Sequence, residues 1–201
     1  MKKILDYFEI DGAVGGNQDW FRNLVMKMGG CAAATACDSC IYFAMHQNRL
    51  HLYPFDVRTL SKEDYIQFSQ KMKPYIRPRM GGVRELSMYI EGFQNYLNDV
   101  GEIHLQMDGF SGEHSVEEAK AFIKKQIDAD YPVPYLMLRH KDKKFEDLTW
   151  HWFLLYGYEE AERDFLVTVA TYGETASLSL EELWNTGEEE KGGLIGYKWI
   201  H

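Results

Sequence analysis

The chain has 201 residues, of which 45% are hydrophobic and 14% aromatic, so it carries enough apolar material for a sizeable core. Its formal net charge of −9 argues against nucleic acid or anionic lipid as a partner, because both require a basic surface. No run approaches the roughly 18 apolar residues of a membrane span, and residues 1–12 lack the apolar run of a signal peptide. We therefore expect one cytoplasmic domain over residues 1–201, with no membrane contact.

The first half of the chain reads as mostly helical, and glycines and prolines mark the breaks between its segments. Ser61, followed by acidic residues, has the pattern of a helix N-cap. The expected elements are an extended segment over residues 3–10, a helix over 20–28 capped by Asp19, a central helix from Cys31 to about His46, a helix over 61–78 and a helix over 83–100.

The second half of the chain reads as strands with two further helices. Ser115 and Glu118 form a capping-box pattern, and Ser179 precedes a short helix. The expected strands are 102–107, 132–138, 150–158, 165–171 and 193–200, and the expected helices are 115–129 and a short one from 179. Because helices come first and strands mostly later, the pattern favours an α+β fold, with a helical part over about 17–100 and a sheet part over about 101–201.

The central helix has small side chains on every face of its first two turns. Since no face requires water, we expect this helix to be buried. Two glycines place Cys31 at its N-terminal end, where free backbone N–H groups and the helix dipole favour a thiolate. The position therefore predicts a Cys31 pKa below the usual value of about 8.5. Taken alone, however, a cysteine in such a helix is more often core packing than a nucleophile.

All three cysteines of the chain, Cys31, Cys37 and Cys40, lie in this one helix. An odd number on one element does not make a disulfide framework. Cys37 and Cys40 have a spacing that one half of a zinc site could use, but no second Cys/His pair at metal spacing follows. We therefore expect no metal and no cofactor, and interpret Cys37 and Cys40 as core residues.

A catalytic cysteine needs a base, and His151 is the candidate. It stands between two tryptophans at the start of the aromatic strand, where it would be rigidly held and partly desolvated. If the following hairpin turns near Ala161, His151 faces Thr171. An Asn or Asp is the usual residue that orients a catalytic imidazole; Thr171 can accept a hydrogen bond but carries no charge. The alternative is a half-buried histidine with a purely structural role.

These pieces together resemble a papain-like cysteine peptidase, in the bacterial branch similar to double-glycine leader peptidases. The resemblance runs in order along most of the chain, from about residue 13 to 185. It rests on Asn17-Gln18, Gly30-Cys31, Pro132-Val133 and the strand His151-Trp152-Phe153-Leu154-Leu155-Tyr156-Gly157-Tyr158. It implies a papain-like fold, in which an N-terminal central helix packs on a mostly antiparallel C-terminal sheet and the helices between 61 and 99 are an inserted region.

The resemblance also implies roles for four residues. Cys31 would be the nucleophile, His151 the general base and acid, and Gln18 an oxyanion donor together with the Cys31 backbone N–H. Two features depart from the family pattern. Gln18 lies thirteen residues before Cys31, so the intervening helix must fold away, and Thr171 stands where an Asp or Asn is expected.

The function expected from these residues is thiol-dependent hydrolysis of a peptide or small acyl or amide substrate through an acyl-enzyme. Three alternatives stay open. The same acyl-enzyme could be intercepted by an amine, which would make the protein an acyltransferase. The fold could serve as an inactive module that binds a peptide or small molecule, or all three cysteines could be core residues and the function lie elsewhere. The sequence leaves the oligomeric state open.

Overall fold

The computed structural model describes residues 1–200 and has an α+β architecture, with a mostly antiparallel sheet and six α-helices in that part of the chain. The helices are α1 (Leu24–Gly29), α2 (Cys31–His46), α3 (Lys62–Met72), α4 (Leu86–Asp99), α5 (Val116–Asp128) and α6 (Leu180–Trp184). The strands are β1 (Lys2–Ile4), β2 (Glu9–Ile10), β3 (Ala13–Val14), β4 (Leu105–Ser111), β5 (Val133–Met137), β6 (His151–Glu160), β7 (Phe165–Thr171), β8 (Glu174–Ser179) and β9 (Gly193–Trp199). Short 3-10 helices η1 (Gln18–Trp20), η2 (Leu50–Leu52) and η3 (Lys143–Leu148) lie in the connections.

A seven-stranded sheet joins most of the strands in the order β4-β9-β5-β6-β7-β8, and β1 adds to it by pairing with β6. Every pairing in this sheet is antiparallel. Strand β6 has β5 and β7 as neighbours, and its residues from His151 to Tyr158 are all buried. Burial on both faces explains why this stretch is a continuous aromatic and apolar run.

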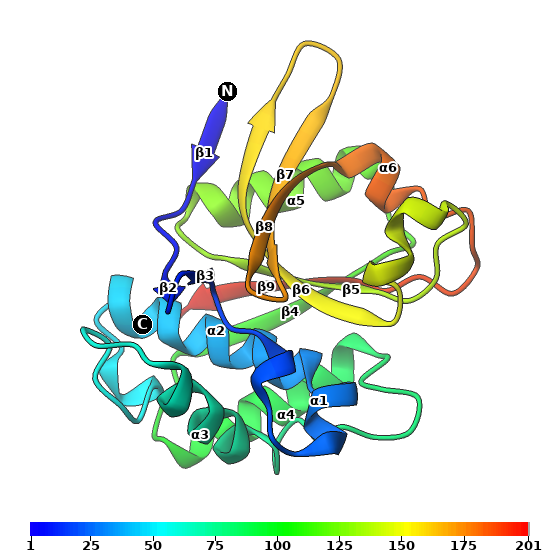
Figure 1. The fold of residues 1–201 in the computed structure, drawn as a ribbon. Coiled ribbons are helices and arrows are strands. Elements are labelled where there is room, and N and C mark those ends of the chain that lie inside the picture. Colours follow the sequence, from blue (N-terminus) through cyan, green and yellow to red (C-terminus); the bar gives the residue numbers. More distant parts are fainter. Residues whose placement is uncertain (201) are drawn as a thin grey trace.

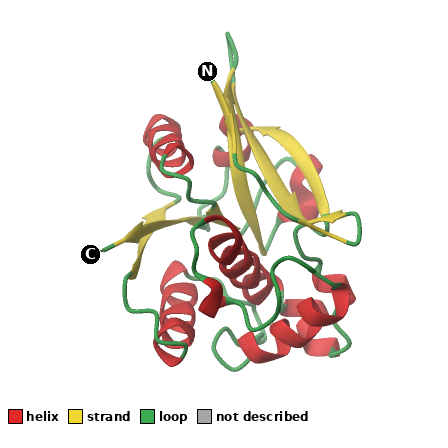
Figure 2. Ribbon diagram, turned by 90° about the vertical axis from the view of Figure 1, so that its left-hand side faces the viewer, coloured by secondary structure: helices red, strands yellow, loops and turns green. Residues whose placement is uncertain are grey.

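Helix α2 lies at the centre of the molecule, between the sheet on one side and helices α1, α3 and α4 on the other (Figures 1 and 2). It packs against β6 and α3. Its alanines Ala32, Ala33 and Ala36 expose at most 1% of their surface, because small side chains let both neighbours approach the helix axis. The prediction of a buried central helix is confirmed.

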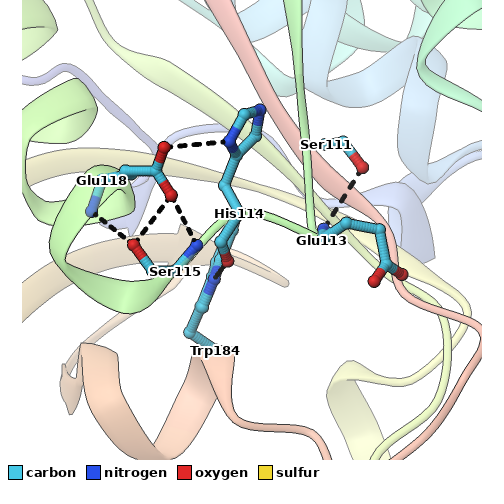
Figure 3. Close-up of polar contacts among 6 residues, drawn as sticks. All are labelled: Ser111, Glu113, His114, Ser115, Glu118 and Trp184. Atoms are coloured by element: carbon cyan, nitrogen blue, oxygen red, sulfur yellow. Dashed lines mark hydrogen bonds and ion pairs between the residues drawn. The ribbon is translucent and has the colours of Figure 1, made fainter.

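The three serine caps predicted from the sequence are confirmed. The hydroxyls of Ser61 and Ser179 accept hydrogen bonds from backbone N–H groups in the first turns of α3 and α6. Ser115 and Glu118 form a complete capping box at the start of α5, where each side chain accepts from the other residue's backbone N–H (Figure 3). Trp184 Nε1 donates to the carbonyl oxygen of His114 at 2.7 Å, which ties α6 to this corner.

The N-terminal segment differs from the prediction. The expected extended segment is split into β1, which joins the large sheet, and β2, which pairs with β3. Between β2 and β3, Asp11 and Gly12 take φ of 52° and 83°, as in the two-residue turn that Asp-Gly favours. The predicted helix over 20–28 starts only at Leu24, because the Asn23 side chain, rather than Asp19, accepts the capping hydrogen bond.

Three boundaries in the rest of the chain also differ, and one strand is additional. Helix α3 ends at Met72 rather than at the predicted 78, because Pro74 has no N–H to continue the helix. Helix α4 starts at Leu86 rather than 83, since Glu85 is still extended with φ −131° and ψ 142°. Strand β4 is shifted toward the C-terminus relative to the predicted 102–107. Strand β8 was not predicted at all: it is mostly exposed, and a two-residue turn of Tyr172 and Gly173, with φ of 52° and 75°, returns the chain to it.

Candidate active site

The position of Cys31 depends on how α1 joins α2. Gly30 is at once the C-cap of α1 and the N-cap of α2. A β-carbon built on Gly30 would lie 2.4 Å from the Met26 carbonyl oxygen, so this tight junction requires glycine. No side chain caps α2, which leaves the first backbone N–H groups of the helix without an intrahelical partner beside Cys31.

The thiol of Cys31 is largely buried, with 9% of the residue exposed. Desolvation raises the pKa of Cys31. The backbone N–H groups of Trp152, Ala32 and Cys31 itself act in the opposite direction but do not overcome the burial. The prediction that the helix N-terminus would lower this pKa is therefore wrong for the structure as it stands, because loss of water outweighs the N–H groups.

His151 is fixed at the start of β6 by two residues at the end of β7. Its Nε2 is hydrogen-bonded to the Thr171 hydroxyl oxygen at 2.7 Å, and the Tyr172 hydroxyl lies 3.4 Å from its Nδ1. The imidazole also stacks on the Tyr172 ring, with the ring centroids 4.6 Å apart and the planes within 2°. Both the plane and the rotation of the imidazole are thus set by its neighbours.

Thr171 reaches His151 through a register that differs from the predicted one. The expected pairing placed His151 directly opposite Thr171, whereas β6 and β7 pair as Leu154 with Ala170, which moves the register by two residues. Side chains alternate with a period of two, so a displacement of two keeps both residues on the same face of the sheet. Their hydrogen bond runs diagonally across the two strands.

Burial also decides the charge of the imidazole. It lowers the pKa of His151 to about 4, so the ring is neutral at neutral pH. In the tautomer that carries its single proton on Nε2 and donates it to Thr171, Nδ1 is an acceptor. A neutral imidazole of this tautomer can accept a proton at Nδ1.

Gln18 lies in η1 and lines the same cleft as Cys31 and His151. Although Gln18 precedes Cys31 by thirteen positions, the intervening residues, including α1, do not separate it from the site. One hydrogen of its amide is used, because Nε2 donates to the Lys27 carbonyl oxygen at 3.1 Å. The second hydrogen of the amide group is left for another acceptor.

Asp38 is a residue of the site that the sequence did not indicate. It follows Cys31 by two helical turns and lines a small cavity of about 20 Å³ together with Cys31 and His151. Its carboxylate accepts hydrogen bonds from the hydroxyls of Tyr7 and Tyr65, at 2.9 and 2.8 Å, and from the Gly16 N–H at 3.1 Å. Burial nevertheless raises the pKa of Asp38 to about 6. Because the three donors come from separate segments, no local sequence pattern predicts these hydrogen bonds.

A cleft of about 720 Å³ opens onto the Cys31 thiol and the His151 ring. This volume falls within the range of about 300–1,000 Å³ that is typical of ligand sites. Besides Cys31, His151 and Gln18, its walls are formed by Val25, Met28 and Gly29 of α1, by Pro78, Arg79, Met80, Gly81, Gly82 and Arg84 of the loop between α3 and α4, and by Thr149, Trp150 and Tyr172. Trp150 takes a φ of 53°, which is strained for a bulky side chain, as it enters β6.

Comparison with known proteins gives little further guidance. No protein-family model matches the chain, and no curated protein matches it. Among solved structures, the crystal structure of the Pseudomonas avirulence protein AvrPphB shows a distant likeness. It matches over 90% of this chain and 94% of its own at 8% sequence identity, with a TM-score of 0.38. At these values the likeness carries no argument about this chain.

The other two cysteines do not take part in the candidate site. Cys37 and Cys40 are fully buried free thiols deeper in α2. Within residues 1–200, no group of three or more His, Cys, Asp or Glu side chains has the arrangement of a metal site. In the same range, no helix is long and apolar enough to cross a membrane.

Proposed function

We propose that this protein is a thiol-dependent amide or peptide hydrolase of papain-like fold, with Cys31 as nucleophile and His151 as general base and acid. The proposal rests chiefly on one observation: Cys31, His151 and Gln18 come from distant segments yet line a single cleft. The hydrogen bond between His151 Nε2 and the Thr171 hydroxyl supports it, because an oriented imidazole is what such chemistry requires. The substrate would be a peptide or a small acyl or amide compound.

In the proposed reaction, the Cys31 sulfur attacks the substrate carbonyl while its proton moves to His151 Nδ1. The carbonyl oxygen becomes an oxyanion, which the Gln18 amide and the Cys31 backbone N–H stabilise. When the intermediate collapses, the carbon–nitrogen bond breaks and His151 protonates the leaving amine. A water molecule, deprotonated by His151, then cleaves the thioester and restores the thiol.

The ionisation of the pair favours concerted proton transfer over a resting ion pair. Burial raises the pKa of Cys31 and lowers the pKa of His151, so thiol and imidazole are both neutral before substrate binds. His151 therefore removes the thiol proton during attack. Thr171 accepts the Nε2–H as positive charge develops on the ring, although it supplies no negative charge.

A second candidate is a binding module that uses the same cleft without chemistry. The observation in its favour is the surroundings of His151: both ring nitrogens already have hydroxyl neighbours, Thr171 and Tyr172, and neither neighbour is charged. An acyltransferase is a variant of the first candidate, since an amine that replaces water in the last step gives transfer. Hydroxylamine would intercept the acyl-enzyme of either variant as a hydroxamate, which a binding module would not form.

Alkylation of Cys31 by iodoacetamide separates the two candidates. If the pair is functional, mass spectrometry will find one adduct, on Cys31, while the fully buried Cys37 and Cys40 serve as internal controls. His151→Gln should slow this alkylation by about tenfold or more at neutral pH, because the base is lost. An unchanged rate in His151→Gln, with the fold intact by circular dichroism, would contradict the hydrolase proposal.

A further inference from the structure

Four solvent-exposed apolar side chains lie around the cleft over Cys31. Val25, Met28, Met80 and Trp150 all line it, and their exposed fractions are 54%, 77%, 104% and 45%. Exposed apolar groups that gather around one concave surface mark a binding site more often than chance. Methionine is also well suited to such a surface, because its flexible thioether adapts to different apolar partners.

The same wall of the cleft carries two arginines that have no counter-ion. Arg79 and Arg84 are both exposed, and neither forms an ion pair within residues 1–200. No Asp or Glu from that range is among the residues that line the cleft. The chain as a whole is negative, with a net charge of −9, so Arg79 and Arg84 make this side of the cleft locally positive.

We propose that the cleft binds an extended peptide segment in which an apolar side chain lies next to two or more Asp or Glu residues. The apolar side chain would occupy the surface formed by Met28, Met80 and Trp150, and the carboxylates would pair with Arg79 and Arg84. A planar guanidinium pairs with a carboxylate through two parallel hydrogen bonds, which fixes geometry as well as charge. This inference rests on the proposed function, since it takes the cleft as the substrate site.

The test measures binding rather than turnover, so that it is independent of the Cys31 chemistry. Fluorescein-labelled peptides of the sequence Glu-Glu-Leu-Ala-Ser are titrated with the Cys31→Ala protein and followed by fluorescence anisotropy. Matched peptides carry Gln-Gln or Lys-Lys in place of Glu-Glu, or Ser in place of Leu. The acidic peptide should bind about tenfold more tightly than the Gln-Gln peptide, with the difference shrinking at high salt.

Variants of the cleft show whether this preference arises there. The double variant Arg79→Glu, Arg84→Glu should prefer the Lys-Lys peptide. Each single variant, Arg79→Glu or Arg84→Glu, should weaken the acidic preference, whereas Arg163→Glu, the same charge change in the exposed turn between β6 and β7, should keep it. Met80→Gln should weaken binding of the Leu peptide more than Met45→Gln, whose side chain is exposed outside the cleft.

Three results would overturn the inference: no saturable binding of the acidic peptide, equal binding of the acidic and Gln-Gln peptides, or the same loss in Arg163→Glu as in the double variant. Inorganic phosphate that binds while the acidic peptide does not would also overturn it, and would assign the arginines to a phosphate. Each of these results leaves the alkylation of Cys31 unaffected. Failure of the alkylation experiment, in turn, leaves the peptide titration interpretable.

Discussion

At the level of single residues, the Thr171 hydroxyl holds the place beside His151 Nε2 that an acidic side chain could also fill. A hydroxyl accepts the N–H but does not offset positive charge on the ring. This absence of charge is one reason why burial alone sets the pKa of His151, at about 4. The imidazole is consequently a weak base, and it is neutral at pH values above about 4.

Replacing this hydroxyl by a carboxylate should change the ionisation of His151. We predict that Thr171→Asp raises the pKa of His151 by about one to three pH units, because an opposite charge within hydrogen-bond distance favours the imidazolium. The measurement is an NMR titration of the His151 ring proton. Thr171→Val, which removes the hydroxyl without adding charge, is the control and should not raise the pKa; equal behaviour of the two variants would contradict the explanation.

At the level of elements, the junction of α1 and α2 fixes where Cys31 stands. We predict that Gly30→Ala destabilises the fold by about 1–3 kcal/mol, because its β-carbon would lie 2.4 Å from a backbone oxygen. Gly29→Ala is the matched control: its β-carbon meets Pro78 at an ordinary 3.4 Å, and a helical alanine is favourable. Urea denaturation of both variants checks this, and equal stabilities would show that the junction relaxes freely.

The segment over residues 13–18 connects the helical part of the site with the sheet. The Val14 N–H donates to the Gly173 carbonyl oxygen at 2.8 Å, and the Asn17 side chain donates to the Tyr172 carbonyl oxygen at 2.7 Å. The Gly16 N–H donates to Asp38 on α2. A β-carbon on Gly16 would overlap the Tyr65 ring, at 1.8 Å, so the segment lies flat against α3 as well. Gln18 is held by these contacts.

A weaker attachment of residues 13–18 should be measurable while the protein as a whole stays folded. We predict that Asn17→Ala speeds hydrogen exchange over residues 13–18 while costing only about 1–3 kcal/mol of stability, since two hydrogen bonds to the backbone, at Tyr172 and Asp19, are removed. Asn95→Ala, at an exposed position on α4, should leave the exchange of this segment unchanged. Exchange that is equally slow in both variants would mean that the backbone contacts alone hold the segment.

The elements that could be predicted from the sequence are those whose signals are local. The serines that cap α3, α5 and α6 bond within their own first turns, so spacing alone reveals them. The Tyr172-Gly173 turn was missed because Tyr is not a usual residue at positive φ, and β8 because its exposed face lacks apolar alternation. Asp38 could not be found, since Tyr7, Gly16 and Tyr65 reach it only through tertiary packing.

At the level of the whole molecule, the two buried ionisable groups of the site act on stability in opposite ways. The pKa of His151 falls from 6.5 to about 4 on folding, so its contribution to stability is present above pH 6.5 and is lost as pH falls toward 4. The pKa of Asp38 rises from 3.8 to about 6, so its contribution is present below 3.8 and is lost as pH rises through 6. Between about pH 4 and 6 the two effects largely cancel.

Replacing either residue alone should therefore show its effect on the pH dependence of stability, which the other residue cancels in the unmodified protein. Relative to it, we predict that Asp38→Asn loses stability as pH falls from 6 to 4, and that His151→Gln gains stability over the same range. Each difference should reach about 3 kcal/mol, measured by urea denaturation at several pH values. If both variants shift in the same direction, these two groups do not control the pH dependence.

The order of the strands in the sheet also affects when the site forms during folding. Strand β9 lies between β4 and β5, and β5 in turn pairs with the start of β6 through Met137 and His151. Pairings between such distant segments form slowly, because long loops must close first. A chain leaving the ribosome thus carries Cys31 long before β9 has been synthesised. On the proposed function, the Cys31 thiol would meet a positioned imidazole only after His151, 120 residues further along the chain, has been synthesised and β6 has paired with β7.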